Sequence, residues 1–246
     1  MPIKYQEILI KNTRNKKIYC DIFSYEPETI EELALGGLYI VSELQSDEDP
    51  SRLANLLNSI IKREYYYSPH RGALESLETS LKKANMSLNE IAQQGNLSWL
   101  GKLHLVCVVI NKQDLFLSQA GEAEAWLCRE GEITNITKKC AENPAKPHPA
   151  KIFQNVISGK IELNDKFLLA TPAFSSLFND QRFKEIFRLP KIEHISERIN
   201  AAIKEQKKVS PFGALLIEMQ PEETAEIPKK RGNFITPPIS LDEVLN

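Results

Sequence analysis

Runs of apolar residues separated by short polar breaks organise the first part of the chain. Residues 3–10 and 17–25 carry β-branched and aromatic side chains around the polar break 12–15, and this pattern predicts a β-hairpin. Residues 36–41 form a short apolar run that is typical of a buried strand. Four further strand-like runs come later: 103–110, 114–119, 123–128 and 133–136. Because the breaks between them are short and rich in turn residues, we expect antiparallel hairpins there as well.

Two other segments repeat apolar residues at helical spacing. The first begins after Pro50 and places leucine and isoleucine along residues 53–61. The second, residues 74–91, keeps steps of three and four over five turns, which predicts an amphipathic helix that packs on a sheet. Further elements are expected in the last third of the domain: strands at 152–157, 166–170 and 214–217, and helices at 181–187 and 192–204. Strands in hairpins with helices packed outside them predict an α+β layered sandwich.

The composition shifts after residue 220. Residues 221–246 are rich in proline and charge and have little apolar periodicity, so we interpret them as a disordered tail or linker. Residues 1–220 are expected to form one domain. The first residues lack the apolar core of a signal peptide, and no apolar run of about 18 residues occurs. We therefore expect a cytoplasmic protein without a membrane segment.

Charge and motifs exclude several classes of function. The chain carries 31 basic and 33 acidic residues, a net charge of −2, which gives no basic face for nucleic acid. The four cysteines have no C-x-x-C spacing and the four histidines form no H-x-x-x-H pair, so a zinc site or a disulfide framework is not expected. P-loop, G-x-S-x-G, G-x-G-x-x-G and H-E-x-x-H motifs are absent from the sequence.

Five short patterns follow one another along residues 1–220. They are the run Gly36–Val41, the pair Ala84-Asn85, the segment Ser118–Leu127, the segment Arg129–Thr137, and the segment Asn164–Thr171. Together they resemble the metal-dependent type 2C (PPM) serine/threonine phosphatases. The resemblance implies that family's fold, an αββα sandwich in which two antiparallel sheets are flanked by helices.

The departures from the family's pattern concern its metal ligands. Catalysis in the family needs two divalent metals that activate a water, and Mg²⁺ or Mn²⁺ prefers carboxylate oxygens. By the resemblance, Glu43 and Leu44 stand at the first Asp-Gly, Glu122 at the Gly-Asp-Ser-Arg aspartate, Pro172 at the Thr-Asp-Gly aspartate, and Ser210 at the final Asp-Asn. Too few carboxylates remain to hold two dications against their mutual repulsion. We therefore expect no metal cofactor.

Two other acidic features have plainer interpretations. The run Asp47-Glu48-Asp49 precedes a predicted helix and complements the positive end of its dipole. Asp21 stands near the place of the family's early acidic residue, where it is interpreted as a relic.

The resemblance and its departures predict a pseudophosphatase, a catalytically inactive PPM-like domain that acts as a regulatory or protein-binding module. The sequence does not name the protein partner. The alternative is a divergent phosphatase with a rebuilt single-metal site for Mn or Mg at Glu43 and Glu122. A third hypothesis is an unrelated α+β binding domain. Candidate contacts to phosphate or a partner are Arg14, Arg71 and Tyr66, the last within a row of three tyrosines.

Overall fold

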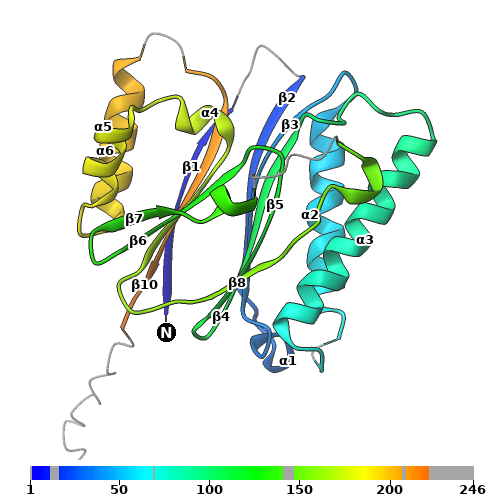
Figure 1. Ribbon diagram of the computed structural model, residues 1–246, viewed down its shortest axis with the longest axis horizontal. Helices are drawn as coiled ribbons and strands as arrows, with labels where there is room; N and C mark the ends of the chain where they lie inside the picture. The colour runs from blue at the N-terminus through cyan, green and yellow to red at the C-terminus, as the bar shows by residue number, and fades with distance from the viewer. Residues whose placement is uncertain (1, 12–16, 69, 141–146, 207–208, 222–246) are drawn as a thin grey trace, which may run out of the picture.

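Two five-stranded sheets lie face to face at the centre of the molecule (Figure 1). The computed structural model describes residues 2–11, 17–68, 70–140, 147–206 and 209–221. Sheet A contains, in spatial order, β1 (Ile3–Ile10), β10 (Phe212–Met219), β9 (Lys166–Ala170), β6 (Glu124–Arg129) and β7 (Glu132–Asn135). Sheet B contains β2 (Ile18–Tyr25), β3 (Gly37–Gln45), β4 (Leu103–Asn111), β5 (Asp114–Ala120) and β8 (Ile157–Lys160). Neighbouring strands pair antiparallel throughout both sheets.

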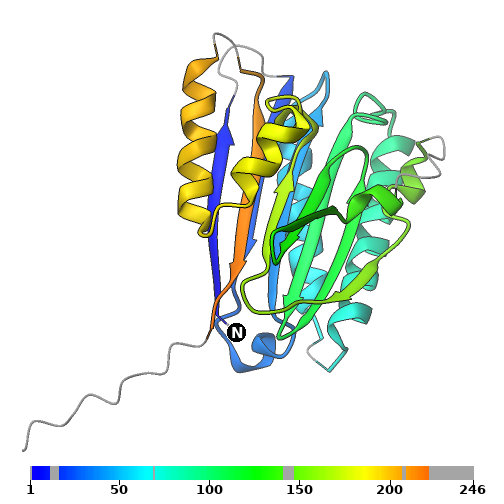
Figure 2. The same ribbon diagram turned by 60° about the vertical axis from the view of Figure 1, so that its left-hand side comes forward.

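A pair of helices covers the outer face of each sheet, as Figures 1 and 2 show. Sheet B carries α2 (Pro50–Tyr66) and α3 (Ala73–Gln93), and sheet A carries α5 (Asp180–Phe187) and α6 (Ile192–Glu205). The remaining helical pieces are short: α1 (Ile30–Leu33), α4 (Pro172–Ser175), and the 3₁₀ turns Thr137–Cys140 and Pro149–Lys151. The predicted αββα sandwich is therefore confirmed.

Strand β3 shows how the sequence builds these layers. Its side chains alternate: Leu38 and Ile40 pack under α2 and α3, while Tyr39 and Val41 pack between the two sheets. All four are fully buried, because β3 is a central strand with an apolar layer on each face. This is why the strand reads as a continuous apolar run. A third apolar cluster fills the space between sheet A and the helices α5 and α6.

The two long helices lie where the sequence predicted them, and both extend beyond the predicted residues 53–61 and 74–91. Asp49 caps α2, its side chain accepting a hydrogen bond from the Ser51 N–H at 3.0 Å, and Pro50 opens the first turn. The α3 side chains Leu77, Leu81 and Leu88 are at most 4% exposed, and burial of each contributes about 2 kcal/mol to folding. Within the described ranges, no helix has the length and apolar character that a membrane span requires.

Two of the predicted hairpins are wrong. Strands β1 and β2 belong to different sheets, so residues 3–25 cross from sheet A to sheet B instead of folding back. Strands β5 and β6 also lie in different sheets, and the turn Ala120–Ala123 carries the chain across the sandwich. Short turns with glycine serve both kinds of connection, because local turn chemistry does not determine which strand becomes the neighbour.

The predicted strand at residues 152–157 is also wrong in most of its length. The N–H groups of Ile152 and Phe153 donate to the side-chain oxygen of Asn85, at 3.1 and 3.0 Å, and the Phe153 carbonyl accepts from the same side chain at 2.8 Å. Backbone groups held by a buried asparagine are not available to a sheet ladder. Strand β8 therefore begins only at Ile157.

Candidate functional site

Several strand ends meet at one end of the sandwich, which we call the site end. Glu43 lies near the C-terminus of β3, and Glu122 lies in the turn from β5 to β6. Pro172 follows β9 and Ser210 precedes β10. Because these strands run antiparallel, residues far apart in the sequence are brought to the same end of the two sheets. The positions singled out by the resemblance thus share one region of the fold.

Glu43 is on the inner face of sheet B, the same face as Tyr39 and Val41. Burial is the main influence on its carboxyl group and raises its pKa above the ordinary value of 4.5, and Glu122 adds to this rise. His104, the Thr171 hydroxyl and the Ala173 N–H act in the opposite direction. One carboxylate oxygen, Oε2, is buried without a hydrogen-bond partner among the described residues. Such orphaned oxygens are rare in native proteins and call for an explanation.

Leu44 points to the other side of the sheet. Its side chain is fully buried in the cluster beneath α2 and α3. The position that the resemblance aligns with the family's metal-motif glycine therefore carries a core side chain, and β3 continues through it to Gln45. A leucine here stabilises the helix layer and has no group that can bind a metal.

His104 and Glu122 also belong to the site end. His104 pairs with Glu43 across β3 and β4, and its Nδ1 accepts a hydrogen bond from the Glu122 N–H at 3.0 Å. The turn requires Gly121, whose φ is +65° and whose missing Cβ would lie 2.4 Å from the Leu103 carbonyl oxygen. The carboxylate of Glu122 is exposed. The imidazole thus links β4, the neighbour of the strand that carries Glu43, to the turn that carries Glu122.

Pro172 and Ser210 bring no negative charge to the site end. Pro172 occupies the first turn of α4, a position that suits proline because no N–H is needed there. Ser210 is exposed just before β10. In the part of the chain that the structure describes, no three His, Cys, Asp or Glu side chains are grouped so that they could hold a metal ion. These donors do not fit a pair of Mg²⁺ or Mn²⁺ ions, which want several hard oxygen ligands each.

Asp21 lies on the opposite face of sheet B from Glu43. It pairs with Ser42, and its Oδ2 accepts a hydrogen bond from Asn58 Nδ2 of α2 at 2.9 Å. Burial raises its pKa. The neighbour of Glu43 on the inner face is Cys20, whose thiol pKa is raised to about 12 by burial first and by Glu43 second. Asp21 is therefore a carboxylate of the helix layer and does not join the site end.

The predicted phosphate or partner contacts do not gather around Glu43. Arg14 lies outside the described residues. Arg71 follows the far end of α2, whose length is about 25 Å, so it lies away from the site end. Tyr66 is 8% exposed, and its hydroxyl donates to the Gly36 carbonyl at 2.6 Å. Of the three tyrosines, Tyr67 is the one that a partner could reach, with 73% of its side chain exposed.

Sequence reasoning missed His104 and Thr171 as residues of the site end. Both stand in strands or at a strand end, without a motif of their own. The signal available for His104 was its position beside the apolar run of β4, which makes it a polar residue at the end of a buried strand. Its pairing with Glu43 depends on strand register, which a single sequence does not give.

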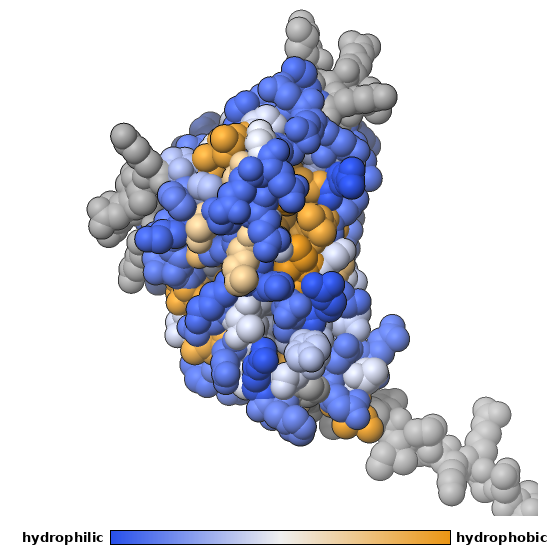
Figure 3. Space-filling model, turned by 90° about the vertical axis from the view of Figure 1, so that its right-hand side faces the viewer, coloured by the Kyte–Doolittle hydropathy of each residue, from blue (hydrophilic) through white to orange (hydrophobic). Residues whose placement is uncertain are grey.

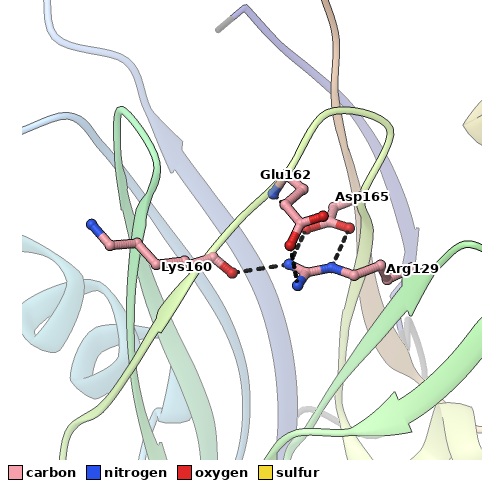
Figure 4. A network of polar contacts seen from close by, with 4 residues as sticks. All are labelled: Arg129, Lys160, Glu162 and Asp165. Atoms are coloured by element: carbon pink, nitrogen blue, oxygen red, sulfur yellow. Dashed lines mark hydrogen bonds and ion pairs between the residues drawn. The ribbon is translucent and has the colours of Figure 1, made fainter.

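A different polar cluster occupies the opposite end of the sandwich, which we call the ion-pair end (Figure 4). Arg129 donates two hydrogen bonds to Asp165, Nε to Oδ1 at 2.9 Å and Nη2 to Oδ2 at 2.6 Å. It also donates to Glu162 at 2.7 Å and to the Lys160 carbonyl at 2.9 Å. Asp165, which is 1% exposed, accepts a further bond from the Glu162 N–H at 2.7 Å. This network ties β6 to the connection between β8 and β9.

Solved structures with the same architecture are serine/threonine phosphatases. The catalytic domain of PstP, in complex with two manganese ions, matches 89% of this chain and 99% of its own length at 14% identity, with a TM-score of 0.66. Stp1 from Staphylococcus aureus matches at 12% identity and a TM-score of 0.62, covering 90% of this chain and 96% of its own. The PPM phosphatase MsPP from Mycobacterium smegmatis, in complex with cacodylate, matches at 11% identity and 0.59, covering 89% and 98%.

No protein-family model and no curated protein matches the sequence. The likeness is therefore one of structure, and at these identities it establishes the fold alone. The chain has the fold of the PPM serine/threonine phosphatases.

Proposed function

We propose that this chain is a pseudophosphatase, a PPM-like domain that has lost catalysis and acts as a regulatory or protein-binding module. One observation carries the proposal: the positions aligned with metal ligands retain only two carboxylates, Glu43 and Glu122, while Pro172 and Ser210 have none. Attack of water on a phosphoryl group in this family depends on two bridged dications. Two glutamates, one on β3 and one exposed in the turn from β5 to β6, do not supply such a site.

The apolar core and the ion-pair network outside the site end support the same proposal. All three apolar layers are filled, and the ion-pair end is fully hydrogen-bonded. A domain that keeps its core while its site loses the charged ligands has been retained for something other than that chemistry. Binding is the function that such a scaffold can still perform, although a fold by itself does not specify a partner.

A divergent phosphatase with one metal is the second candidate. The observation in its favour is that Glu122 is close enough to raise the pKa of the Glu43 carboxyl group, so a cation between the two would relieve their repulsion. Against it, the main influence on Glu43 is burial, which favours its neutral form. Burial therefore disfavours the charged form, which is the form that Mg²⁺ or Mn²⁺ needs as a ligand.

Titration of Mn²⁺ into the purified chain by calorimetry, with a parallel assay of p-nitrophenyl phosphate hydrolysis in millimolar Mn²⁺, distinguishes the two. We expect neither binding heat nor turnover. Micromolar binding that disappears in Glu43→Gln would contradict the proposal and support the single-metal enzyme. The PstP catalytic domain serves as the active control, and the double variant Glu43→Asp/Pro172→Asp tests whether added aspartates produce a binding signal at the site end.

A further inference from the structure

A small polar cluster lies between sheet B and α2, on the opposite face of the sheet from Glu43. Asp21 of β2 and Ser42 of β3 stand directly opposite each other in the antiparallel pair. Asn58 of α2 donates a hydrogen bond from Nδ2 to Asp21 Oδ2 at 2.9 Å. The side chains around them on this face of the sheet are mostly apolar. We call Asp21, Ser42 and Asn58 the helix-layer cluster.

Two oxygen atoms of the helix-layer cluster, Ser42 Oγ and Asn58 Oδ1, are buried without a hydrogen-bond partner among the described residues. Ser42 is 1% exposed and Asn58 is 4% exposed. Figure 3 views the molecule from the side of α2 and α3, where the surface is largely hydrophilic with hydrophobic side chains between, and the cluster lies beneath these helices. Buried polar atoms are nearly always hydrogen-bonded, so two orphaned oxygens beside one carboxylate call for a ligand.

The third oxygen donor of the cluster is the partly buried carboxylate of Asp21. Burial is the main influence on it and raises its pKa. Lys11, an exposed residue just after β1, acts in the opposite direction through its charge alone. The side chains that donate hydrogen bonds to the carboxylate are neutral: Asn58 at 2.9 Å and the Tyr19 hydroxyl at 3.5 Å. A cation that binds the carboxylate directly would stabilise its charge in this apolar layer.

The donor set decides which cation fits. A carboxylate, an amide carbonyl and a hydroxyl are hard oxygen ligands, which suit ions such as Na⁺, Mg²⁺ and Ca²⁺. Mg²⁺ requires six ligands in near-ideal octahedral geometry, and Ca²⁺ takes six to eight. One carboxylate balances a single positive charge, and a dication would leave excess charge under the helix. The cluster therefore favours a monovalent cation.

We propose that the helix-layer cluster binds a monovalent cation such as Na⁺ through the Asp21 carboxylate, Ser42 Oγ and Asn58 Oδ1. The ion joins β2, an edge strand of sheet B, and β3 to the middle of α2. The inference does not rest on the loss of catalysis, because the cluster and Glu43 lie on opposite faces of sheet B.

Thermal unfolding of the full-length chain in increasing NaCl tests the proposal, with the ionic strength held constant by N-methyl-D-glucamine chloride. This organic cation is too large for a site enclosed under a helix. We expect the melting temperature of the wild type to rise with Na⁺ concentration, because a ligand of the folded state stabilises it by mass action. Asp21→Asn keeps the shape of the side chain and an acceptor for Asn58, but it should lose the dependence on Na⁺.

The matched control is Asp47→Asn. Asp47 follows β3, but its side chain is 67% exposed and pairs with Lys17 at 2.7 Å, so its variant should keep the full dependence on Na⁺. Ser42→Ala removes one neutral ligand and should raise the Na⁺ concentration needed for half of the effect several-fold. Broadening of the ²³Na NMR signal by the folded wild type measures binding without any substitution, which keeps the proposal testable if a variant fails to fold.

Two outcomes would overturn the proposal. One is a wild-type melting temperature that stays the same when Na⁺ replaces the organic cation, with no broadening of the ²³Na signal, which means that the orphaned oxygens bind only water. The other is a dependence on Na⁺ that Asp21→Asn retains in full, which places the ion elsewhere on the chain.

Discussion

Each end of the sandwich holds a carboxylate with a buried oxygen, Asp165 at the ion-pair end and Glu43 at the site end, and the two have different hydrogen-bond partners. At the ion-pair end, Asp165 accepts two hydrogen bonds from Arg129 and one from the Glu162 N–H. At the site end, Glu43 has one buried oxygen without a partner among the described residues. Folded proteins satisfy almost all buried polar groups, and the exceptions cluster where function has shaped the structure.

The contrast lies in the neighbours of the two carboxylates. An arginine that pairs with a buried aspartate is part of what holds β6, β8 and β9 in place, so its loss would affect the whole domain. The main influences on the Glu43 carboxyl group, besides burial, come from a hydroxyl, a backbone N–H, an imidazole and the Glu122 carboxylate. The two carboxylates therefore differ in their surroundings: Asp165 has a paired cation, and Glu43 has polar neighbours together with one buried oxygen without a hydrogen-bond partner among the described residues.

The largest change in the free energy of unfolding is expected for a substitution at the ion-pair end. Replacing Arg129 by alanine leaves the carboxylate of Asp165 buried and without its cation. We expect the free energy of unfolding to fall by about 2–4 kcal/mol, between the cost of an unpaired buried acceptor and that of a broken buried ion pair. Urea unfolding followed by circular dichroism measures this change.

The matched control for that variant is Arg182→Ala. Arg182 also pairs with a carboxylate, Glu205, at 3.1 Å, but both side chains are at least half exposed. Exposed ion pairs contribute at most about 1 kcal/mol. If both variants lose the same stability, burial of Asp165 is not what makes the network important, and the comparison between the two ends fails.

At the site end, a substitution is expected to change the free energy of unfolding less, and to raise it instead of lowering it. Glu43→Gln keeps the shape of the side chain but removes the charge that burial disfavours. We expect it to leave the stability at pH 7 unchanged or to raise it by up to about 1 kcal/mol. A loss of more than about 2 kcal/mol would show instead that the carboxylate makes an interaction on which the fold depends, as Asp165 does.

Much of the fold could be predicted from the sequence, because its elements carry strong periodic signals. The helix at residues 74–91 places leucine on one face, and α3 spans Ala73–Gln93. The strand 166–170 is confirmed without change as β9. The connections were less predictable. Whether the turn at Gly121 joins neighbours or crosses between sheets depends on contacts of the whole domain, and the two interpretations have the same local sequence.

The site end was predictable only where a motif marks it. Glu43, Glu122, Pro172 and Ser210 were found through resemblance, and the fold brings all four to one end. His104 was not found, because its role comes from the register that places it opposite Glu43. Tyr66 was chosen from a row of three tyrosines, but helical spacing alone did not show that it turns inward while Tyr67 is exposed.

The smallest predicted effect is a pH dependence of stability that comes from Glu43 at the site end. Burial raises the pKa of Glu43 above 4.5, so the folded protein holds this proton more tightly than the unfolded chain does. The corresponding stability is fully present below pH 4.5 and is lost as the pH rises through the raised pKa. Glu43→Gln has no such proton, so its stability relative to the wild type should increase over the same interval. Urea titrations of both proteins between pH 4.5 and 8 measure the difference. A constant difference would mean that Glu43 is as well solvated in the folded protein as in the unfolded chain, and a decreasing one would mean that an unidentified cation stabilises its charge, as Arg129 does for Asp165.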